Sequence, residues 1–269
     1  MTAPVCWVRR RTVAALVLAV VLCLTLAGCG APVQEQASAA QIDGLTYVGT
    51  VPLSYADQFS IDCYEGGYAL ITISNGDRLL VIPPEKEPPA ALEEDIVAIR
   101  QPVENLYVAA SAAMDFFAAL DCLDAVRLCG LQAGDWYVEE ARTAMEQGAL
   151  LYAGKYSGPD YELLLAQGCT LSVQNTMIEH APEVREKLRD LGIAVLEDYS
   201  SYEAHPLGRC EWIKVYGTLL GKNEEAEALF AAQKEYLDAV AEVEETGKTV
   251  VLINILKGRM AVSRSISDY

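Results

Sequence analysis

Aromatic and polar side chains recur just after several apolar segments of this chain. Open parallel sheets bind ligands beyond the carboxyl ends of their strands, so such positions predict one shared site. Tyrosine and tryptophan offer broad apolar faces with one polar group, which suits a large planar or chelating ligand. Each aromatic residue alone fits an ordinary packing role equally well, and each cation fits a solvated surface role. The predicted ligand contacts are Trp136, Lys155, Tyr156, Tyr199, Tyr202 and Arg209.

Signatures of enzyme or metal chemistry are weak. The chain has no G-x-S-x-G nucleophile motif and no H-E-x-x-H metal motif. Its two histidines, His180 and His205, lie far apart in the sequence, and no C-x-x-C pair occurs. Gly247-Lys248-Thr249 resembles the end of a phosphate-binding P-loop, but Glu242 stands where the first glycine belongs. We therefore predict no catalytic residue, cofactor or metal site, with a Ser–His–Asp cluster formed in three dimensions as an open alternative.

The N-terminus carries the signals of an exported lipoprotein. Three arginines, at positions 9–11, precede an apolar run from Val13 to Leu26 that is short for a membrane-spanning helix. Leu26-Ala27-Gly28-Cys29 then has the form of a bacterial lipobox. Cleavage before Cys29 would leave that residue to carry lipid, and would tie a water-soluble body to the outer face of a membrane. The alternative is an uncleaved signal anchor.

The charge and the cysteine content limit which partners and which redox environment the protein can have. Loss of residues 1–28 removes three arginines and no acid, which leaves 17 basic against 38 acidic residues. Nucleic acid is excluded as a partner because phosphate binding needs a basic surface. Five cysteines besides Cys29 would remain, an odd number that cannot pair completely within one chain. A free thiol would suit a reducing habitat. These cysteines are Cys63, Cys122, Cys129, Cys169 and Cys210.

Hydrophobic patterning predicts an α/β protein. Residues 44–82 read as β structure, with a type I′ hairpin at Asn75-Gly76, and a proline-rich linker follows. Short apolar strands then alternate with helices, which predicts a parallel sheet with helices on both faces. The expected strands are 96–99, 126–129, 150–152, 171–173 and 193–196, and the expected helices are 105–120, 136–146, 161–167 and 182–190, with Asp135 and Asp160 as N-caps.

A longer helix is expected near the C-terminal end. Residues 223–245 form a 3.6-residue apolar pattern capped by Asn223, and would span roughly 34 Å at 1.5 Å per residue. That length can join two lobes. A new strand, Thr249 to Ile255, begins after Gly247. The predicted fold class is therefore a Rossmann-like parallel-sheet lobe, a long inter-lobe helix and the start of a second α/β lobe, with an extra N-terminal β segment.

Three motifs give the region from Ile96 onward a family resemblance. Residues 154–165 read Gly-Lys-Tyr-Ser-Gly-Pro-Asp-Tyr-Glu-Leu-Leu-Leu, a Gly-rich loop followed by a helix start. Residues 191–195 read Leu-Gly-Ile-Ala-Val, with Ala194 in place of a usual proline, and residues 219–227 read Leu-Leu-Gly-Lys-Asn-Glu-Glu-Ala-Glu. Together they resemble the helical-backbone substrate-binding proteins of ABC transporters, the ferric-siderophore, haem and cobalamin group. Residues 200–212 resemble an iron-siderophore branch of that group.

The resemblance implies a lipid-anchored binding protein at the extracytoplasmic face of the cell membrane. Its ligand would be a ferric siderophore or related chelate, delivered to ABC permease subunits that dock on glutamates; Glu162 matches the first-lobe glutamate. A first-turn glutamate stabilised by the helix dipole is the alternative. Haem or cobalamin binding, a lipid-anchored enzyme and a structural envelope lipoprotein remain alternatives. The resemblance also implies roughly 100 further residues, the size of one lobe, beyond Tyr269.

The patterns and the resemblance together predict six regions. They are a signal peptide (1–28), a tether (29–43), an N-terminal β segment with its linker (44–90), a first α/β lobe (91–204), a helical region with the inter-lobe helix (205–246) and an incomplete second lobe (247–269).

Overall fold

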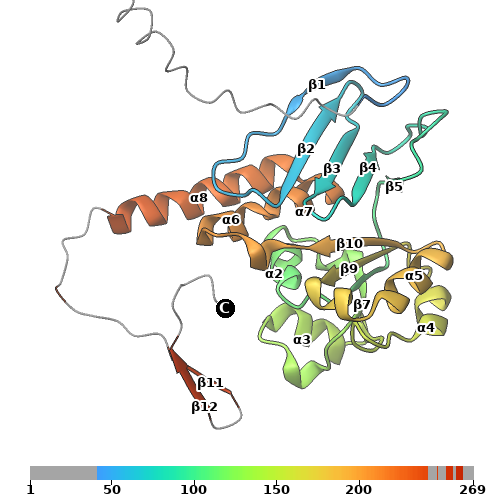
Figure 1. Ribbon diagram of the computed structural model, residues 1–269. Helices are drawn as coiled ribbons and strands as arrows, with labels where there is room; N and C mark the ends of the chain where they lie inside the picture. Colours follow the sequence, from blue (N-terminus) through green and yellow to red (C-terminus); the bar gives the residue numbers. More distant parts are fainter. Residues whose placement is uncertain (1–40, 242–246, 248–252, 257–258, 263–269) are drawn as a thin grey trace, which may run out of the picture. The chain divides into compact units, whose positions relative to one another are not determined.

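The computed structural model describes residues 41–241, Gly247, 253–256 and 259–262 (Figure 1). A first sheet has the strand order β1-β2-β3-β4-β5, in which β1 to β4 are antiparallel and β5 runs parallel to β4. The inner strands β3 and β4 are mostly buried on both faces, whereas β1 and most of β5 are exposed or half-buried. The strands are β1 (Tyr47–Thr50), β2 (Phe59–Tyr64), β3 (Ala69–Ile73), β4 (Arg78–Ile82) and β5 (Ile96–Arg100).

A second sheet is entirely parallel, in the order β10-β9-β6-β7-β8, as the strand–helix alternation predicted. Residues of α2 and α3 share one core with the first sheet, and residues of α4 and α5 form a separate core on the other face. The strands are β6 (Leu106–Val108), β7 (Val126–Cys129), β8 (Leu151–Tyr152), β9 (Leu171–Asn175) and β10 (Ala194–Asp198). The helices are α2 (Ala113–Ala119), α3 (Glu139–Glu146), α4 (Tyr161–Ala166) and α5 (Pro182–Asp190), with 3₁₀ turns η1 (Leu123–Ala125), η2 (Ala133–Asp135), η3 (Thr176–His180) and η4 (Ser200–Tyr202).

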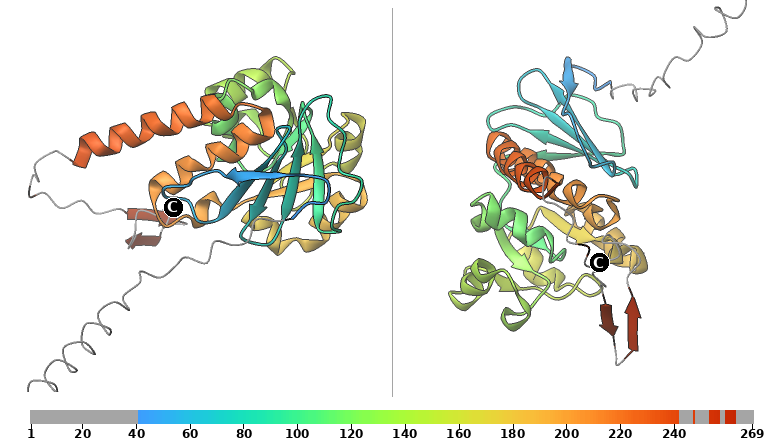
Figure 2. Two further views of the ribbon diagram at one scale, coloured as in Figure 1. Left: turned by 90° about the horizontal axis from the view of Figure 1, so that it is seen from above. Right: turned by 90° about the vertical axis from the view of Figure 1, so that its left-hand side faces the viewer.

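Three further helices follow β10: α6 (Pro206–Glu211), α7 (Ile213–Leu220) and α8 (Asn223–Ala241). Helix α7 ends at Gly221, whose φ of 71° is the left-handed conformation of a helix C-cap. The start of α8 packs on α7 through Ala226 and Phe230, whereas residues 231–240 are exposed (Figure 2). The predicted helix end at 242–245 lies outside the described residues.

A short antiparallel pair, β11 (Ile253–Leu256) and β12 (Arg259–Val262), follows α8 in the chain. The first part of the predicted strand Thr249 to Ile255 also lies outside the described residues. Within the part of the chain that the structure describes, no helix is long and apolar enough to cross a bilayer.

Two predictions about the beginning of the parallel sheet are wrong. The strand at residues 96–99 is present as β5, but it pairs with β4 in the first sheet. The central strand of the parallel sheet is instead β6, inside the predicted helix 105–120, and α2 begins only at Ala113. A short, fully buried strand carries no alternating pattern, so periodicity does not separate Leu106-Tyr107-Val108 from a buried helix.

Turn and cap chemistry was predicted with mixed success. Asp160 caps α4 as expected, because its Oδ1 accepts a hydrogen bond of 3.0 Å from the Leu163 N–H. Asp135 does not cap α3, which starts at Glu139 after the 3₁₀ turn η2. The β3–β4 hairpin forms at Asn75-Gly76, but only Gly76 has a positive φ, of 92°. Its turn is therefore not type I′, which requires a positive φ at both residues.

Two buried carboxylates fasten the first sheet to the helices. Glu211 and Glu203 are almost fully buried, and both point at a loop formed by residues 54–58. The Glu211 carboxylate accepts from the backbone N–H groups of Ser54, Tyr55 and Ala56 at 2.8–3.0 Å. The Glu203 carboxylate accepts from the backbone N–H groups of Asp57 and Gln58 and from the Trp212 indole N–H, at 2.8–3.1 Å. Buried charge is tolerated only with such partners.

A second polar cluster joins the β3–β4 hairpin to α5 and β10. Arg185 of α5 lies 2.9 Å from Glu197 of β10 and also contacts Asp77 at the hairpin tip. Arg189 reaches the other oxygen of Asp77 at 2.9 Å, and the Asn75 amide donates to Glu197 at 3.0 Å. Glu197 is fully buried, and burial raises the pKa of its carboxyl although Arg185 opposes that shift.

We expect Glu211→Ala to lower the free energy of unfolding by about 3 kcal/mol, because three backbone N–H groups would lose a buried acceptor. Urea unfolding followed by circular dichroism measures the loss. Glu235→Ala, at an exposed position on α8, is the matched control and should change stability by less than about 0.5 kcal/mol. Equal effects of the two substitutions would contradict the role of Glu211.

Stability should fall as the pH rises above about 4.5, because burial raises the pKa values of the Glu197, Asp198 and Glu203 carboxyls. The folded state then binds protons that the unfolded chain has released, so the stabilisation is complete below the ordinary pKa and is lost as the pH passes the raised one. Glu197→Gln should flatten the fall of stability above about pH 4.5 in urea unfolding, whereas Glu183→Gln, at an exposed position, should not. An unchanged slope in Glu197→Gln would refute the prediction.

Candidate ligand-binding site

The strand order places a topological switch point beside β6. From β6 the chain passes to β7 and β8 on one side, then returns to β9 and β10 on the other. In open α/β sheets the connections diverge at such a point and leave a crevice beyond the carboxyl ends of the strands. Here the residues after β6 begin with Ala109-Ala110-Ser111-Ala112, and those after β9 form η3. This carboxyl edge of the second sheet is the candidate ligand-binding site.

Tyr199 and Tyr202 lie together after β10, at this edge. Their ring centroids are 5.4 Å apart, with the ring planes at 45°. Tyr202 is 59% exposed and presents its ring to solvent, whereas Tyr199 is only 9% exposed and lies against it. The Tyr199 hydroxyl donates a hydrogen bond to the Glu179 carboxylate in η3. The two tyrosines form an aromatic surface that is supported from the neighbouring strand connection.

Arg209 joins the same corner from α6. Its guanidinium donates to the Ser201 carbonyl at 3.2 Å, next to Tyr202 in the chain. The side chain is half-buried, so part of it remains accessible. His205 caps the helix that carries it, because the His205 Nδ1 accepts from the Leu207 N–H at 3.1 Å. The structure therefore brings three of the six predicted contacts, Tyr199, Tyr202 and Arg209, into one group.

Lys155 and Tyr156 lie on a tight loop between β8 and α4. Gly154 has a φ of 84°, and a Cβ there would lie 2.4 Å from the Gly158 carbonyl oxygen, so the close turn requires glycine. The Tyr107 hydroxyl also donates to the Gly154 carbonyl at 2.8 Å. Lys155 is exposed and Tyr156 is half-buried against the core beneath α4. Both residues follow the carboxyl end of β8, as the sequence predicted.

Trp136 occupies the core rather than the surface of this edge. Its side chain is 3% exposed and packs in the core shared with the first sheet, while the next residue, Tyr137, is 99% exposed. The Arg142 guanidinium fixes this segment by donating to the Trp136 carbonyl at 2.7 Å. Periodicity could not predict which aromatic residue faces outward, because the 3₁₀ turn η2 interrupts the helical pattern just before Trp136. The exposed aromatic ring in this loop is that of Tyr137.

The six predicted contacts include no residue of the connection that follows β9. Met177 is 44% exposed, and Glu179 is exposed beside Tyr199. The start of η3 is fixed by Asn175, whose Oδ1 accepts from the Met177 N–H at 3.0 Å. The signal that identifies them is topological: β9 is the partner of β6 at the switch point, so its connection lies next to the connection that follows β6.

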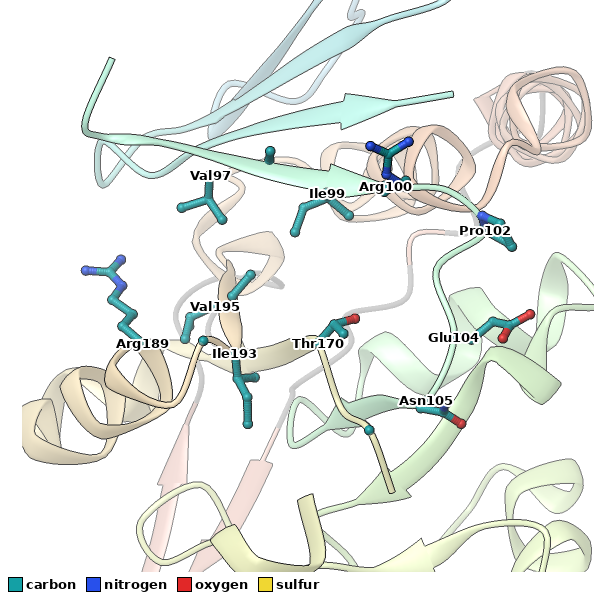
Figure 3. A pocket seen from close by; sticks show the side chains of 14 residues that line it. Val97, Ile99, Arg100, Pro102, Glu104, Asn105, Thr170, Arg189, Ile193 and Val195 are labelled. Carbon is teal, nitrogen blue, oxygen red and sulfur yellow. The ribbon is translucent and has the colours of Figure 1, made fainter. Parts of the chain in front are cut away.

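A cavity of about 700 Å³ lies at the opposite edge of the sheet (Figure 3). Val97 and Ile99 project into it from β5, and Thr170, Ile193 and Val195 line the side formed by the amino ends of β9 and β10. It contains none of the six predicted ligand contacts. The candidate site on the described lobe is therefore the aromatic surface of Tyr199 and Tyr202, which is separate from this cavity.

Metal and thiol chemistry find little support among the described residues. They contain no cluster of three histidine, cysteine or acidic side chains arranged to hold a metal ion. The five cysteines of the described residues are free thiols, and burial raises the pKa of each, to about 11 for Cys169. A raised thiol pKa keeps cysteine protonated and unreactive at neutral pH.

Glu162 lies in the first turn of α4, with its side chain exposed. Asp160 already caps this helix, so the Glu162 carboxylate is not needed as a cap. Leu165, one turn further along, is also unusually exposed for a leucine, at 49%. The pair forms a small acidic and apolar surface on α4.

No family model matches the chain. Its sequence is 24% identical over 185 residues to an uncharacterized lipoprotein of Methanocaldococcus jannaschii, a match that covers 65% of this chain and 45% of the relative. A second uncharacterized lipoprotein of that organism is 26% identical over 100 residues, which cover 35% of this chain and 23% of the relative. The chain thus spans less than half the length of the curated relatives that it matches.

Solved structures show the same fold. The petrobactin-binding protein YclQ of Bacillus subtilis superposes with a TM-score of 0.52 at 12% identity, over 72% of this chain and 60% of that one. The periplasmic haem-binding protein HutB of Vibrio cholerae superposes with a TM-score of 0.50 at 19% identity, over 60% and 58%. At these identities the likeness concerns the fold. The chain has the periplasmic-binding-protein-like α/β fold that its motifs predicted.

Proposed function

We propose that this protein is the lipid-anchored substrate-binding component of an ABC importer, and that it captures a ferric siderophore-type chelate for delivery to the permease. The observation that carries the proposal is the aromatic surface of Tyr199 and Tyr202 at the carboxyl edge of a sheet with this fold. The names of the two solved neighbours support the ligand class, since one binds petrobactin and the other haem.

The proposed site suits a large chelate better than a small solute. Exposed tyrosine rings contribute apolar area and a hydroxyl each, so they contact the organic shell of a chelate at many angles. Lys155 follows β8 and Arg209 lies on α6 after β10, and their positive charge would attract an anionic ligand despite the acidic chain. The iron would enter as cargo inside its chelate and would need no protein ligand.

Haem is the second candidate, favoured by the likeness to a haem-binding protein. Haem iron in proteins takes histidine or tyrosine as an axial ligand. Tyr202 offers an exposed phenol at the proposed site, and His180 is exposed at the end of η3. A titration that includes both ligand classes separates the candidates.

We also propose how the protein meets the membrane and the permease. Cys29 would carry the lipid anchor, which agrees with the lipoprotein names of both curated relatives. Glu162 would dock on a basic pocket of the permease, because its carboxylate is exposed on α4 and the helix is capped by Asp160 instead. Leu165 would add an apolar contact beside it.

The first test is a fluorescence titration of the longest form of the protein that its gene encodes. We expect one ferric siderophore to quench tryptophan fluorescence saturably at micromolar or lower concentration. Alanine at Tyr156 or Tyr202 should weaken that affinity roughly 10-fold, the loss of a stacking contact of about 1.4 kcal/mol. Tyr236→Ala, which removes an equally exposed tyrosine from α8, is the control.

Each outcome of the titration is informative. Saturation by haem alone would select the second candidate. Absence of binding across ferric siderophores, haem and cobalamin would refute the proposed function, and unchanged affinity in both tyrosine variants would refute the placement of the site.

Glu162→Arg should leave ligand affinity unchanged and impair ligand uptake by intact cells, because it reverses the charge of the docking surface alone. Uptake of the radiolabelled chelate measures transport. Glu146→Arg, which reverses an exposed acid at the end of α3, is the control. Normal uptake with Glu162→Arg would remove the docking role from this residue.

A further inference from the structure

We propose that Glu179 is a positioning residue of the ligand-binding site, which acts through Tyr199 to hold the exposed ring of Tyr202. The inference rests on the proposed function. It adds a residue that acts through Tyr199, without direct contact with the ligand or with Tyr202. It is carried by the juxtaposition of η3, which follows β9, with η4, which follows β10.

The contacts form a chain from Glu179 to the surface. The Glu179 Oε1 accepts a hydrogen bond from the Tyr199 hydroxyl, which fixes the far end of that ring. The ring of Tyr199 in turn lies 5.4 Å from that of Tyr202, at a tilt of 45°. Tyr199 is buried and Tyr202 is exposed, so Tyr199 is the inner support and Tyr202 the outer face.

The hydrogen bond is of a strong kind, and its phenol donor keeps its proton. A phenol that donates to an ionised carboxylate makes a charge-assisted hydrogen bond. Burial, together with that hydrogen bond, raises the pKa of the Tyr199 phenol, so the hydroxyl remains a donor at any physiological pH. Arg185 lies near enough to act electrostatically on Tyr199, but its nearest acidic contacts are Asp77 and Glu197.

The position of Glu179 favours a role in the site over one in folding. Its side chain is exposed, and the turn that carries it is fixed separately by the Asn175 side chain and by Ile178, which is fully buried. Removal of the carboxylate therefore spares the core. It leaves the Tyr199 hydroxyl, in a mostly buried place, without its acceptor, and such a group moves to recover a partner. That movement would take the support from Tyr202.

The test is the titration of the best-binding chelate with a set of variants. Glu179→Ala and Tyr199→Phe should each weaken affinity about 5- to 20-fold, because each breaks the same hydrogen bond. Glu179→Gln should stay within about twofold of the unsubstituted protein, because the amide oxygen still accepts from the phenol. Glu183→Ala, at an exposed acid on the following helix, is the matched control and should bind normally.

A double-substitution cycle shows the route of the effect. In a Tyr202→Ala background, Glu179→Ala should add less than about twofold, since no ring remains to be held. A full additional loss in that background would overturn the inference, because Glu179 would then contact the ligand itself. Equal affinity of Glu179→Ala and the unsubstituted protein would overturn it as well.

A measurement without ligand separates this inference from the proposed function. The close pair of tyrosine rings should contribute to near-ultraviolet circular dichroism, and that band should weaken in Glu179→Ala and persist in Glu179→Gln. If no chelate binds the unsubstituted protein, the proposed function fails while this spectrum still decides whether Glu179 positions the rings. An unchanged spectrum in Glu179→Ala would overturn the positioning.

Discussion

The hydrogen bonds from the 54–58 loop to Glu203 and Glu211 are the interaction on which the arrangement of this molecule depends. Five consecutive residues direct their backbone N–H groups at two buried carboxylates, which would be costly to bury without those donors. Glu203 and Glu211 flank α6, between the tyrosines after β10 and the start of α7. The loop therefore fixes the segment that carries the proposed site and leads into α8, so the N-terminal sheet is part of the lobe's construction.

The hairpin tip of the first sheet reinforces the same connection from the other side. Asp77 takes two arginines of α5, and Asn75 reaches Glu197 near the carboxyl end of β10. Strand β10 is an edge strand, and these contacts cover its polar residues with charge partners instead of a further strand. Both attachments converge on the end of β10, which is where Tyr199 and Tyr202 begin. A rigid base for exposed aromatic rings follows from this double attachment.

The sequence predicted the architecture well where patterns extend over a helix or a connection. The bounds of α5 were predicted without error. Errors fell on short buried elements. Three apolar residues, Leu106 to Val108, form the central strand, and only their pairing with β7 and β9 distinguishes them from a helical turn. Strand β5 joined the first sheet, against prediction, for the same reason. Which strand pairs with which depends on tertiary structure and not on the local sequence.

The site shows the same division between local and tertiary information. Strand ends and the Gly154 loop led to the prediction of a site at this edge of the sheet, since loop chemistry is local and the carboxyl edge follows from the parallel topology. Whether an aromatic residue faces outward depends on packing: Trp136 turned inward and Tyr137 outward within one dipeptide. Glu179 carries no motif, and its relation to Tyr199 arises only when η3 and η4 meet across the ends of β9 and β10. Residues that support other residues are therefore the part of such a site that sequence patterns reveal last.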